Sequence, residues 1–159
     1  MLSDENDNFI RDYEVMYDMT LLQLHDFICS DLGYDKTEIA SFYLSDRYWE
    51  KLQEYTLFDL GPGEGPIAME RVKLGQIIQK KNERLILLFD MLNERSLYLE
   101  LTASAKASEG VEYPLVVLSR GSAPNQYAPA DSAETGGSIF DDAMDEFGGF
   151  EGDELYDDE

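Results

Sequence analysis

The sequence predicts an α+β fold, in which a mixed or mostly antiparallel sheet of about 5–6 strands carries one main helix and a short second helix on one face. Three observations predict it. A capped amphipathic helix spans residues 20–32. Several short apolar runs alternate with the period of a strand. The elements follow one another as strand, helix, strands, short helix and hairpin, which favours α+β over a parallel α/β sheet.

The main helix has recognisable ends. Thr20 and Gln23 fit a capping box, in which each side chain accepts a hydrogen bond from the backbone N–H of the other residue. Gly33 is placed to end the helix in a left-handed conformation. The apolar stripe that would face the sheet consists of Leu21, Leu24, Phe27 and Ile28. A shorter helix is expected over residues 74–79.

Six segments read as strands, namely residues 9–17, 39–45, 52–58, 85–89, 97–101 and 115–118. The run at 85–89 is entirely apolar, which is typical of a central strand covered on both faces. A turn at Asn93 and Glu94 should join it to the next strand in an antiparallel hairpin. The first strand lacks an obvious N-terminal partner. Either it lies at an edge of the sheet, or the chain lacks a strand that its relatives have.

Charge divides the chain. Residues 131–159 hold 12 of the 34 acids and none of the 12 bases, so they carry more than half of the net charge of −22. Like-charge repulsion and glycine entropy oppose a packed state there. We therefore expect an α+β domain over residues 1–122, and a linker with a disordered acidic tail over residues 123–159.

The composition indicates which classes of binding partner and which compartment to expect. A net charge of −22 makes nucleic acid an unlikely partner and allows a basic protein. Cys29 is the only cysteine, so no internal disulfide can form. The acidic N-terminus does not resemble a signal peptide, and no apolar stretch approaches the ~20 residues that span a bilayer. These features predict a cytoplasmic protein without membrane contact.

No sequence motif identifies a reaction or a cofactor. His25 and Cys29 lie four residues apart on the predicted helix and would share a face. They could form a catalytic pair or half of a metal site, but each is the only residue of its type. The favoured interpretation is that both pack at the edge of the core, which leaves no predicted catalytic or metal-binding residue.

Two other groups of residues are candidates for binding. Asp90 follows the buried run and is expected to cap a turn; alternatively, it lines a pocket with Trp49 and Tyr113. The main basic concentration, which could contact phosphate, form a solvated helix face or dock the acidic tail, comprises Arg71, Lys73, Lys80, Lys81 and Arg84.

The acidic tail has a pattern of its own. Large apolar residues recur among its acids, at Phe140, Met144, Phe147, Phe150 and Tyr156. Such a segment can be an interaction motif that orders on a basic or grooved partner. It can equally be a solubilising tail, and the sequence leaves both open.

Several short motifs, in order, resemble the plasmid pRiA4b ORF-3-like family, in particular acidic-tailed members of the Bacteroidetes type. They are Thr20 with Leu24-His25, Gly33-Tyr34, Ser41-Phe42-Tyr43, Trp49-Glu50-Lys51, Thr56-Leu57, Leu74, Phe89-Asp90 and Tyr113-Pro114. The resemblance covers residues 9–121 and implies an α+β fold with a helix on a mixed or antiparallel sheet. It implies no function, because the domain is uncharacterised.

The chain departs from the family pattern in two places. Residues 91–93 stand where many relatives have a glycine and an acid, and residues 124–127 stand where many have a proline-rich acidic stretch. The resemblance therefore carries no ligand site over to these segments.

Taken together, the sequence predicts a non-enzymatic protein-interaction module whose acidic-aromatic tail engages a basic or grooved partner. The alternatives are a ligand-binding or enzymatic domain with a pocket near Trp49, Asp90 and Tyr113, and a mobile-element or nucleic-acid accessory protein.

Overall fold

In the computed structural model, which describes residues 1–127, one sheet of eight strands carries the helices. The strands are β1 (Leu2–Ser3), β2 (Ile10–Glu14), β3 (Ser41–Ser45), β4 (Lys51–Thr56), β5 (Ile67–Ala68), β6 (Arg84–Asp90), β7 (Arg95–Glu100) and β8 (Leu115–Arg120). The helices are α1 (Leu21–Leu32), α2 (Leu74–Ile77) and a 3₁₀ turn, η1 (Met69–Arg71).

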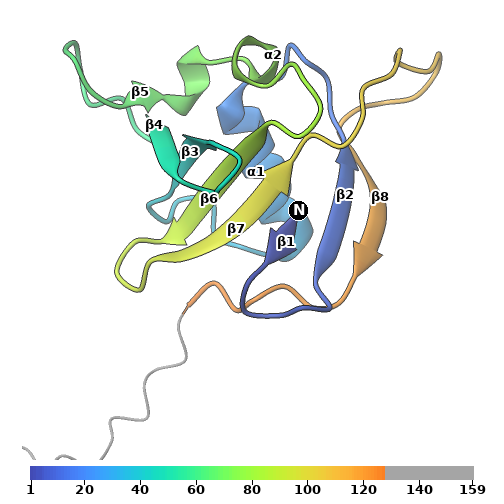
Figure 1. Cartoon of the computed structure of the whole chain (residues 1–159), viewed down its shortest axis with the longest axis horizontal. Coiled ribbons are helices and arrows are strands. Elements are labelled where there is room, and N and C mark those ends of the chain that lie inside the picture. Colours follow the sequence, from blue (N-terminus) through green and yellow to red (C-terminus); the bar gives the residue numbers. More distant parts are fainter. Residues whose placement is uncertain (128–159) are drawn as a thin grey trace, which may run out of the picture. The chain divides into compact units, whose positions relative to one another are not determined.

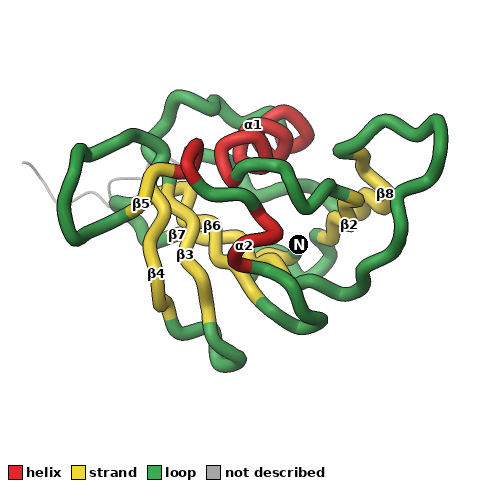
Figure 2. The backbone as a smooth tube through the Cα atoms, turned by 90° about the horizontal axis from the view of Figure 1, so that it is seen from above, coloured by secondary structure: helices red, strands yellow, loops and turns green. Residues whose placement is uncertain are grey.

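The strands lie in the order β5-β4-β3-β6-β7-β1-β2-β8. All neighbours pair antiparallel except β4 and β5, which pair parallel. The predicted mixed, mostly antiparallel α+β fold is thus confirmed, as is the β6–β7 hairpin. Figure 1 shows the sheet with α1 behind it, and Figure 2 shows the β3–β4 and β2–β8 strands on either side of α2.

The predicted number of strands was too low. The two that the sequence did not indicate are β1 and β5, each of two residues. A two-residue strand cannot show an alternating pattern, so periodicity cannot detect it. The predicted first strand was also too long, because the backbone turns after Glu14 and the Met19 N–H donates to the Met16 carbonyl at 3.1 Å.

The first long strand, β2, does not lie at an edge, and its N-terminal partner is present. Strand β1 pairs with it at Leu2 and Ile10, and β8 covers its other side. No sequence signal indicated this partner, because an acidic stretch precedes Phe9. It forms the connection between the two strands, where the Phe9 N–H donates to the Asn6 carbonyl at 2.9 Å.

Helix α1 forms as its sequence predicts. The Thr20 hydroxyl accepts from the Gln23 N–H at 3.1 Å, and the Gln23 side chain accepts from the Thr20 N–H at 2.9 Å. Gly33 ends the helix with φ 71°. Three residues of its apolar stripe, Leu21, Leu24 and Ile28, share one core cluster with residues of β6. Among the described strands, β6 is the only one with five consecutive buried residues. This contact between the buried faces of the helix and the sheet forms the core.

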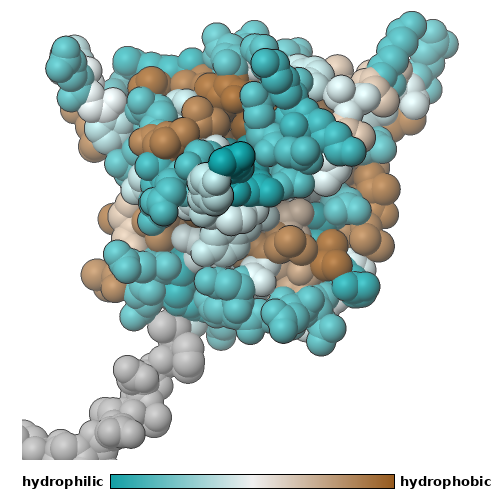
Figure 3. All heavy atoms as spheres, viewed as in Figure 1, coloured by the Kyte–Doolittle hydropathy of each residue, from teal (hydrophilic) through white to brown (hydrophobic). Residues whose placement is uncertain are grey.

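The β8 end of the sheet is more exposed to solvent. All six residues of β8 are at least partly exposed, and Figure 3 shows hydrophobic side chains along the edge that Figure 1 assigns to β8. Within residues 1–127, no helix has the length and apolar character needed to cross a bilayer.

Candidate functional site

The sheet has a gap between β2 and β7, because the strand that joins them is only two residues long. Strand β1 reaches Tyr98 of β7 through Leu2, and Met1 exchanges backbone hydrogen bonds with Arg11 of β2. Beyond that point β7 continues to Glu100 and β2 to Glu14 with no described strand between them. Figure 1 shows the N-terminus at the base of this gap.

The gap is a half-open cleft of about 130 Å³. Its floor is apolar, because side chains from or next to α1, α2, β6 and β7 reach the gap from behind. They are Leu24, Leu74, Ile78, Leu85, Leu99 and Leu101. A cavity of roughly 150 Å³ is enough to hold a benzene ring, so this cleft has room for one large apolar side chain or a ligand of similar size.

The rim of the cleft is acidic, with carboxylates at Asp12, Glu83 and Glu100. Glu100 pairs with Arg84 at 2.7 Å. Glu83 accepts from the N–H groups of Gln79 and Lys80, and these hydrogen bonds hold the pKa of its carboxyl below the usual range. Asp12 alone of the three forms no ion pair or side-chain hydrogen bond within residues 1–127. It is therefore the rim carboxylate that no other described side chain engages.

The Met1 ammonium group lies at the base of the cleft. It donates to the Arg11 carbonyl at 2.6 Å. Burial lowers the pKa of this amine, while the negative charges of Asp12 and Glu100 act in the opposite direction. The two carboxylates thus favour a positive charge inside the cleft.

One wall of the cleft is held rigid from behind. The Arg11 guanidinium pairs with Asp31 of α1 at 3.2 Å, and the Tyr13 hydroxyl donates to the same carboxylate at 2.7 Å. Burial and this carboxylate raise the pKa of Tyr13, so the phenol remains a hydrogen-bond donor. Tyr13 also packs edge-on against Phe27, with ring centroids 5.0 Å apart. A wall fixed in this way suits binding.

Comparison with known proteins places the chain in a family. A model of the plasmid pRiA4b ORF-3-like proteins matches residues 1–137, most of the 159 residues. The chain belongs to the plasmid pRiA4b ORF-3-like family. The match extends beyond the predicted residues 9–121 at both ends.

A solved structure shares the fold of this family member. It is a protein of unknown function, MM3350, from Methanosarcina mazei Go1, with a TM-score of 0.58 and 20% sequence identity. The match covers 70% of this chain and 61% of that one, so the chain spans less than two thirds of its neighbour. No curated protein matches the chain.

The family member does not bring the predicted pocket residues together. Trp49 lies in the β3–β4 turn, where the Arg84 guanidinium at the start of β6 stacks 4.5 Å from its ring. Asp90 ends the same strand. At ~3.3 Å per residue, it lies about 20 Å along the strand from Arg84. The Tyr113 hydroxyl accepts from the Ser108 N–H at 3.1 Å, in the loop before β8.

Asp90 caps a turn, as the favoured interpretation predicted. Its carboxylate accepts from the backbone N–H and the side-chain amide of Asn93 at 3.1 and 2.8 Å. These bonds, with Arg95, hold the pKa of the Asp90 carboxyl below its usual range. Residues 91–93 belong to this turn.

His25 and Cys29 are both buried on α1, as predicted. The Cys29 Sγ lies 3.5 Å from the His25 Nε2. Burial raises the pKa of the thiol to about 11 and lowers the pKa of the imidazole. Both groups are therefore neutral near pH 7, and the thiol is not an activated nucleophile. Within residues 1–127, no three His, Cys, Asp or Glu side chains cluster as metal ligands would.

The basic segment is partly used within the fold. Arg71 pairs with Asp59, and Arg84 pairs with Glu100 and stacks on Trp49. The predicted tail residues Phe140, Met144, Phe147, Phe150 and Tyr156 lie outside the described residues.

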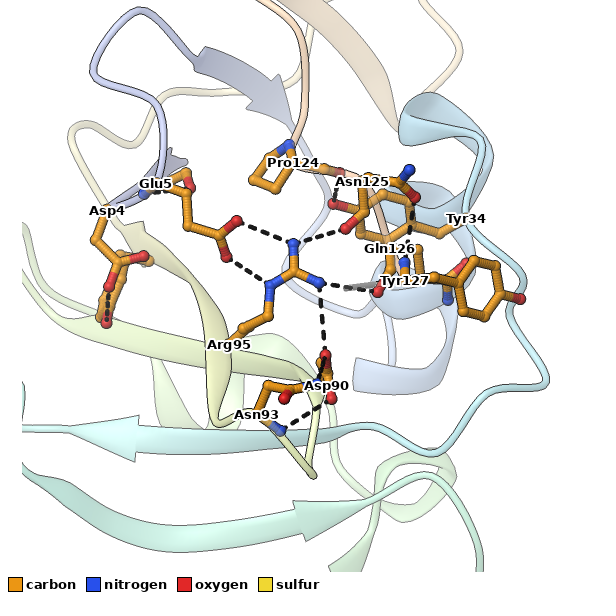
Figure 4. A network of polar contacts seen from close by, with 12 residues as sticks. Asp4, Glu5, Tyr34, Asp90, Asn93, Arg95, Pro124, Asn125, Gln126 and Tyr127 are labelled. Atoms are coloured by element: carbon orange, nitrogen blue, oxygen red, sulfur yellow. Dashed lines mark hydrogen bonds and ion pairs between the residues drawn. The ribbon is translucent and has the colours of Figure 1, made fainter. Parts of the chain in front are cut away.

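Sequence reasoning missed the cleft and its rim. Asp12 and Glu100 read as ordinary polar positions on strands. The signal that could have indicated the gap is the acidic stretch at residues 4–7, which limits the first strand to a few residues. The sequence reasoning also missed Arg95. Its guanidinium binds Glu5, Asp90 and the carbonyls of Asn125 and Gln126 (Figure 4).

Proposed function

We propose that this chain is a non-enzymatic protein-interaction module, and that the cleft between β2 and β7 takes a basic, extended segment of a partner protein. The observation that carries the proposal is a cleft with an apolar floor and an acidic rim at a break in the sheet. A binding site of this kind combines a pocket for one side chain with strand edges that an added strand can pair with.

The partner segment is specified by the cleft. The volume of about 130 Å³ and the leucine-rich floor favour one large apolar side chain as the anchor. Asp12 favours a lysine or arginine beside that anchor. The net charge of the chain also favours a basic partner, because residues 1–130 hold 22 acids and 12 bases and the tail adds 12 acids. The tail would thus speed the encounter with a basic partner.

The alternative of a small-ligand or catalytic pocket at Trp49, Asp90 and Tyr113 has less support. Trp49 stacks on Arg84 at the start of β6, whereas Asp90 ends that strand and contacts Arg95. A nucleic-acid accessory role through the basic segment has less support as well, because Arg71 and Arg84 already pair with carboxylates.

Defined peptides test the proposal. The probe is an end-capped peptide with a central phenylalanine flanked by lysines, measured by fluorescence anisotropy with the full chain. We expect binding with a Kd in the range of about 10–100 µM. Replacing the lysines by glutamates should abolish binding, and replacing the phenylalanine by glycine should weaken it at least about tenfold.

Matched variants locate the binding site. Thr102→Trp places a large side chain at the exposed rim of the cleft and should block the peptide, whereas Ser104→Trp, which lies outside the lining residues, should not. Asp12→Asn should weaken binding about two- to fivefold. Equal affinity for the lysine and glutamate peptides, or equal effects of the two tryptophans, would contradict the proposal.

Removing residues 131–159 separates electrostatic attraction by the tail from binding in the cleft. The truncated chain should keep its fold and its response to Thr102→Trp, while its affinity falls and becomes less dependent on salt. A truncated chain with unchanged affinity at low salt would show that the tail takes no part in capture.

A further inference from the structure

Strand β8 has apolar residues on both faces although it lies at the edge of the sheet. Val116, Val117 and Leu118 are 37%, 55% and 43% exposed. A strand with one neighbour normally shows polar residues toward solvent, and exposed edges usually carry a lysine or proline that prevents further pairing. The run Leu115–Arg120 contains neither. Its composition is that of a strand with a second neighbour.

The charges at the two ends of β8 are complementary. Arg120 lies opposite Ile10 of β2, and Leu115 lies opposite Glu14. Ile10 and Glu14 point to the same face of β2, so the Arg120 and Glu14 side chains share one face of the sheet at opposite ends of β8. Within residues 1–127, neither side chain forms an ion pair with another residue.

We propose that β8 pairs antiparallel with β8 of a second copy of this chain. Antiparallel pairing about a two-fold axis near Val117 and Leu118 places Arg120 opposite Leu115 of the second copy, next to that copy's Glu14. The same contact forms twice, as an isologous interface requires. It covers the apolar run and gives each unpaired Arg120 an unpaired carboxylate.

One feature of the strand limits how far this pairing extends. The register between β2 and β8 shifts between Asp12 and Tyr13, which leaves Val117 without a partner residue in β2. Such a bulge increases the local twist and protects an edge against unlimited addition of strands. The geometry therefore favours a short ladder between two copies and opposes a longer assembly.

Other occupants of this edge fit less well. The acidic tail of the chain would bring 12 carboxylates and no cation to it. A basic segment would find Arg120 at one end of the strand. A second copy is the occupant that matches both an apolar centre and ends of opposite charge.

Sedimentation of the full chain tests the proposal. At about 100 µM protein we expect a dimer. Its affinity should rise as salt rises from about 0.05 to 0.5 M, because the two copies repel each other through a net charge of −22 each. The peptide binding proposed above should weaken over the same range, so the two proposals can fail separately.

Two variants identify the surface. Val117→Lys should give a monomer at about 100 µM, whereas Leu92→Lys, which changes the 95% exposed Leu92 in the β6–β7 turn, should leave the dimer intact. Far-ultraviolet circular dichroism and the melting temperature confirm that both variants fold. A wild-type monomer at every salt concentration, or a dimer that survives Val117→Lys, would overturn the proposal.

Single introduced cysteines test the register. Cys29 is buried with a raised pKa, so an added thiol on β8 reacts selectively. We expect intermolecular disulfides for Val117→Cys or Leu118→Cys, next to the axis, and none for Leu92→Cys or Arg120→Cys. Equal cross-linking at all four positions would mean random collision and would contradict an ordered antiparallel pair.

Discussion

Arg95 joins three segments that lie far apart along the described chain. Its guanidinium makes two 2.9 Å hydrogen bonds to Glu5, contacts Asp90 at 3.5 Å, and donates to the Asn125 and Gln126 carbonyls at 2.7 and 3.3 Å (Figure 4). Only 13% of the side chain is exposed. One residue of β7 thus holds the segment before β2 and the segment after β8.

We expect Arg95→Met to lower the free energy of unfolding by about 2–3 kcal/mol, since it leaves carboxylates and carbonyls without their donor. Urea denaturation measures the loss, and limited proteolysis should find faster cleavage near residues 122–127. Arg71→Met is the control, because its pair with Asp59 is exposed and worth less than about 1 kcal/mol. Equal losses in both variants would refute this role of Arg95.

His25 should make stability depend on pH. Burial lowers the pKa of its imidazole, although Asp26 opposes this effect. Below the unfolded pKa of about 6.5 the unfolded chain binds a proton that the folded chain does not, so stability falls as pH falls from 6.5 toward the folded pKa. The slope attributable to His25 is at most about 1.4 kcal/mol per pH unit.

Chemical denaturation of wild type and His25→Leu between pH 7 and pH 5 measures this contribution, since shared carboxylate titrations cancel in the difference. The wild type should lose stability relative to the variant as the pH falls. Parallel curves would mean that folding leaves the pKa of His25 unchanged, which would contradict the effect of burial.

Single residues differ in how far their roles could be predicted. The turn role of Asp90 could be predicted, because a carboxylate after a buried strand and before Asn93 has local partners. The roles of Arg11 and Arg95 could not, because their partners Asp31, Glu5 and Asn125 are far away in sequence. From sequence alone, a charged residue on a strand is expected to be exposed. It becomes buried only when a residue far away in the sequence pairs with it.

At the scale of elements, the end of β8 depends on a close backbone approach. Gly121 has φ 69°, and a Cβ there would lie 2.7 Å from the carbonyl carbon of Asn8. The Arg11 guanidinium also binds the carbonyls of Arg120 and Gly121 at 2.9 and 3.1 Å. A side chain at this position would therefore push β8 away from the connection between β1 and β2.

Gly121→Ala should destabilise the chain by about 2–4 kcal/mol, from left-handed strain and the clash together. Gly110→Ala is the matched control: its φ is 76°, and a Cβ there would meet nothing within 4 Å. It should cost about 1 kcal/mol. Thermal denaturation compares the two, and equal losses would show that the approach to Asn8 relaxes without cost.

Elements with strong local signals were predictable, and elements defined by their neighbours were not. Helix α1 carries both of its caps in its own sequence, and β6 is apolar throughout its centre. Strands β1 and β5 exist only because longer strands lie beside them, Leu2 against Tyr98 and Ile67 against Tyr55. The cleft follows from the shortness of β1, so it was equally invisible to periodicity.

For the whole molecule, the proposed function rests on an acidic net charge acting together with the cleft between β2 and β7. The sheet supplies a rigid gap, Arg11 and Tyr13 fix one wall of it through Asp31, and the net charge of −22 attracts basic chains. The composition predicts a basic partner, whereas the cleft proposed to take it depends on how eight strands are ordered, which no single segment encodes.

The most direct measurement is backbone amide chemical-shift mapping of the isotope-labelled full chain, titrated with the lysine-flanked phenylalanine peptide. We expect the largest shifts in residues 12–15 and 99–102, on the two sides of the cleft, and we expect Thr102→Trp to remove them. Shifts confined to other surfaces, or shifts that the glutamate-flanked peptide reproduces, would contradict docking of a basic segment in the cleft.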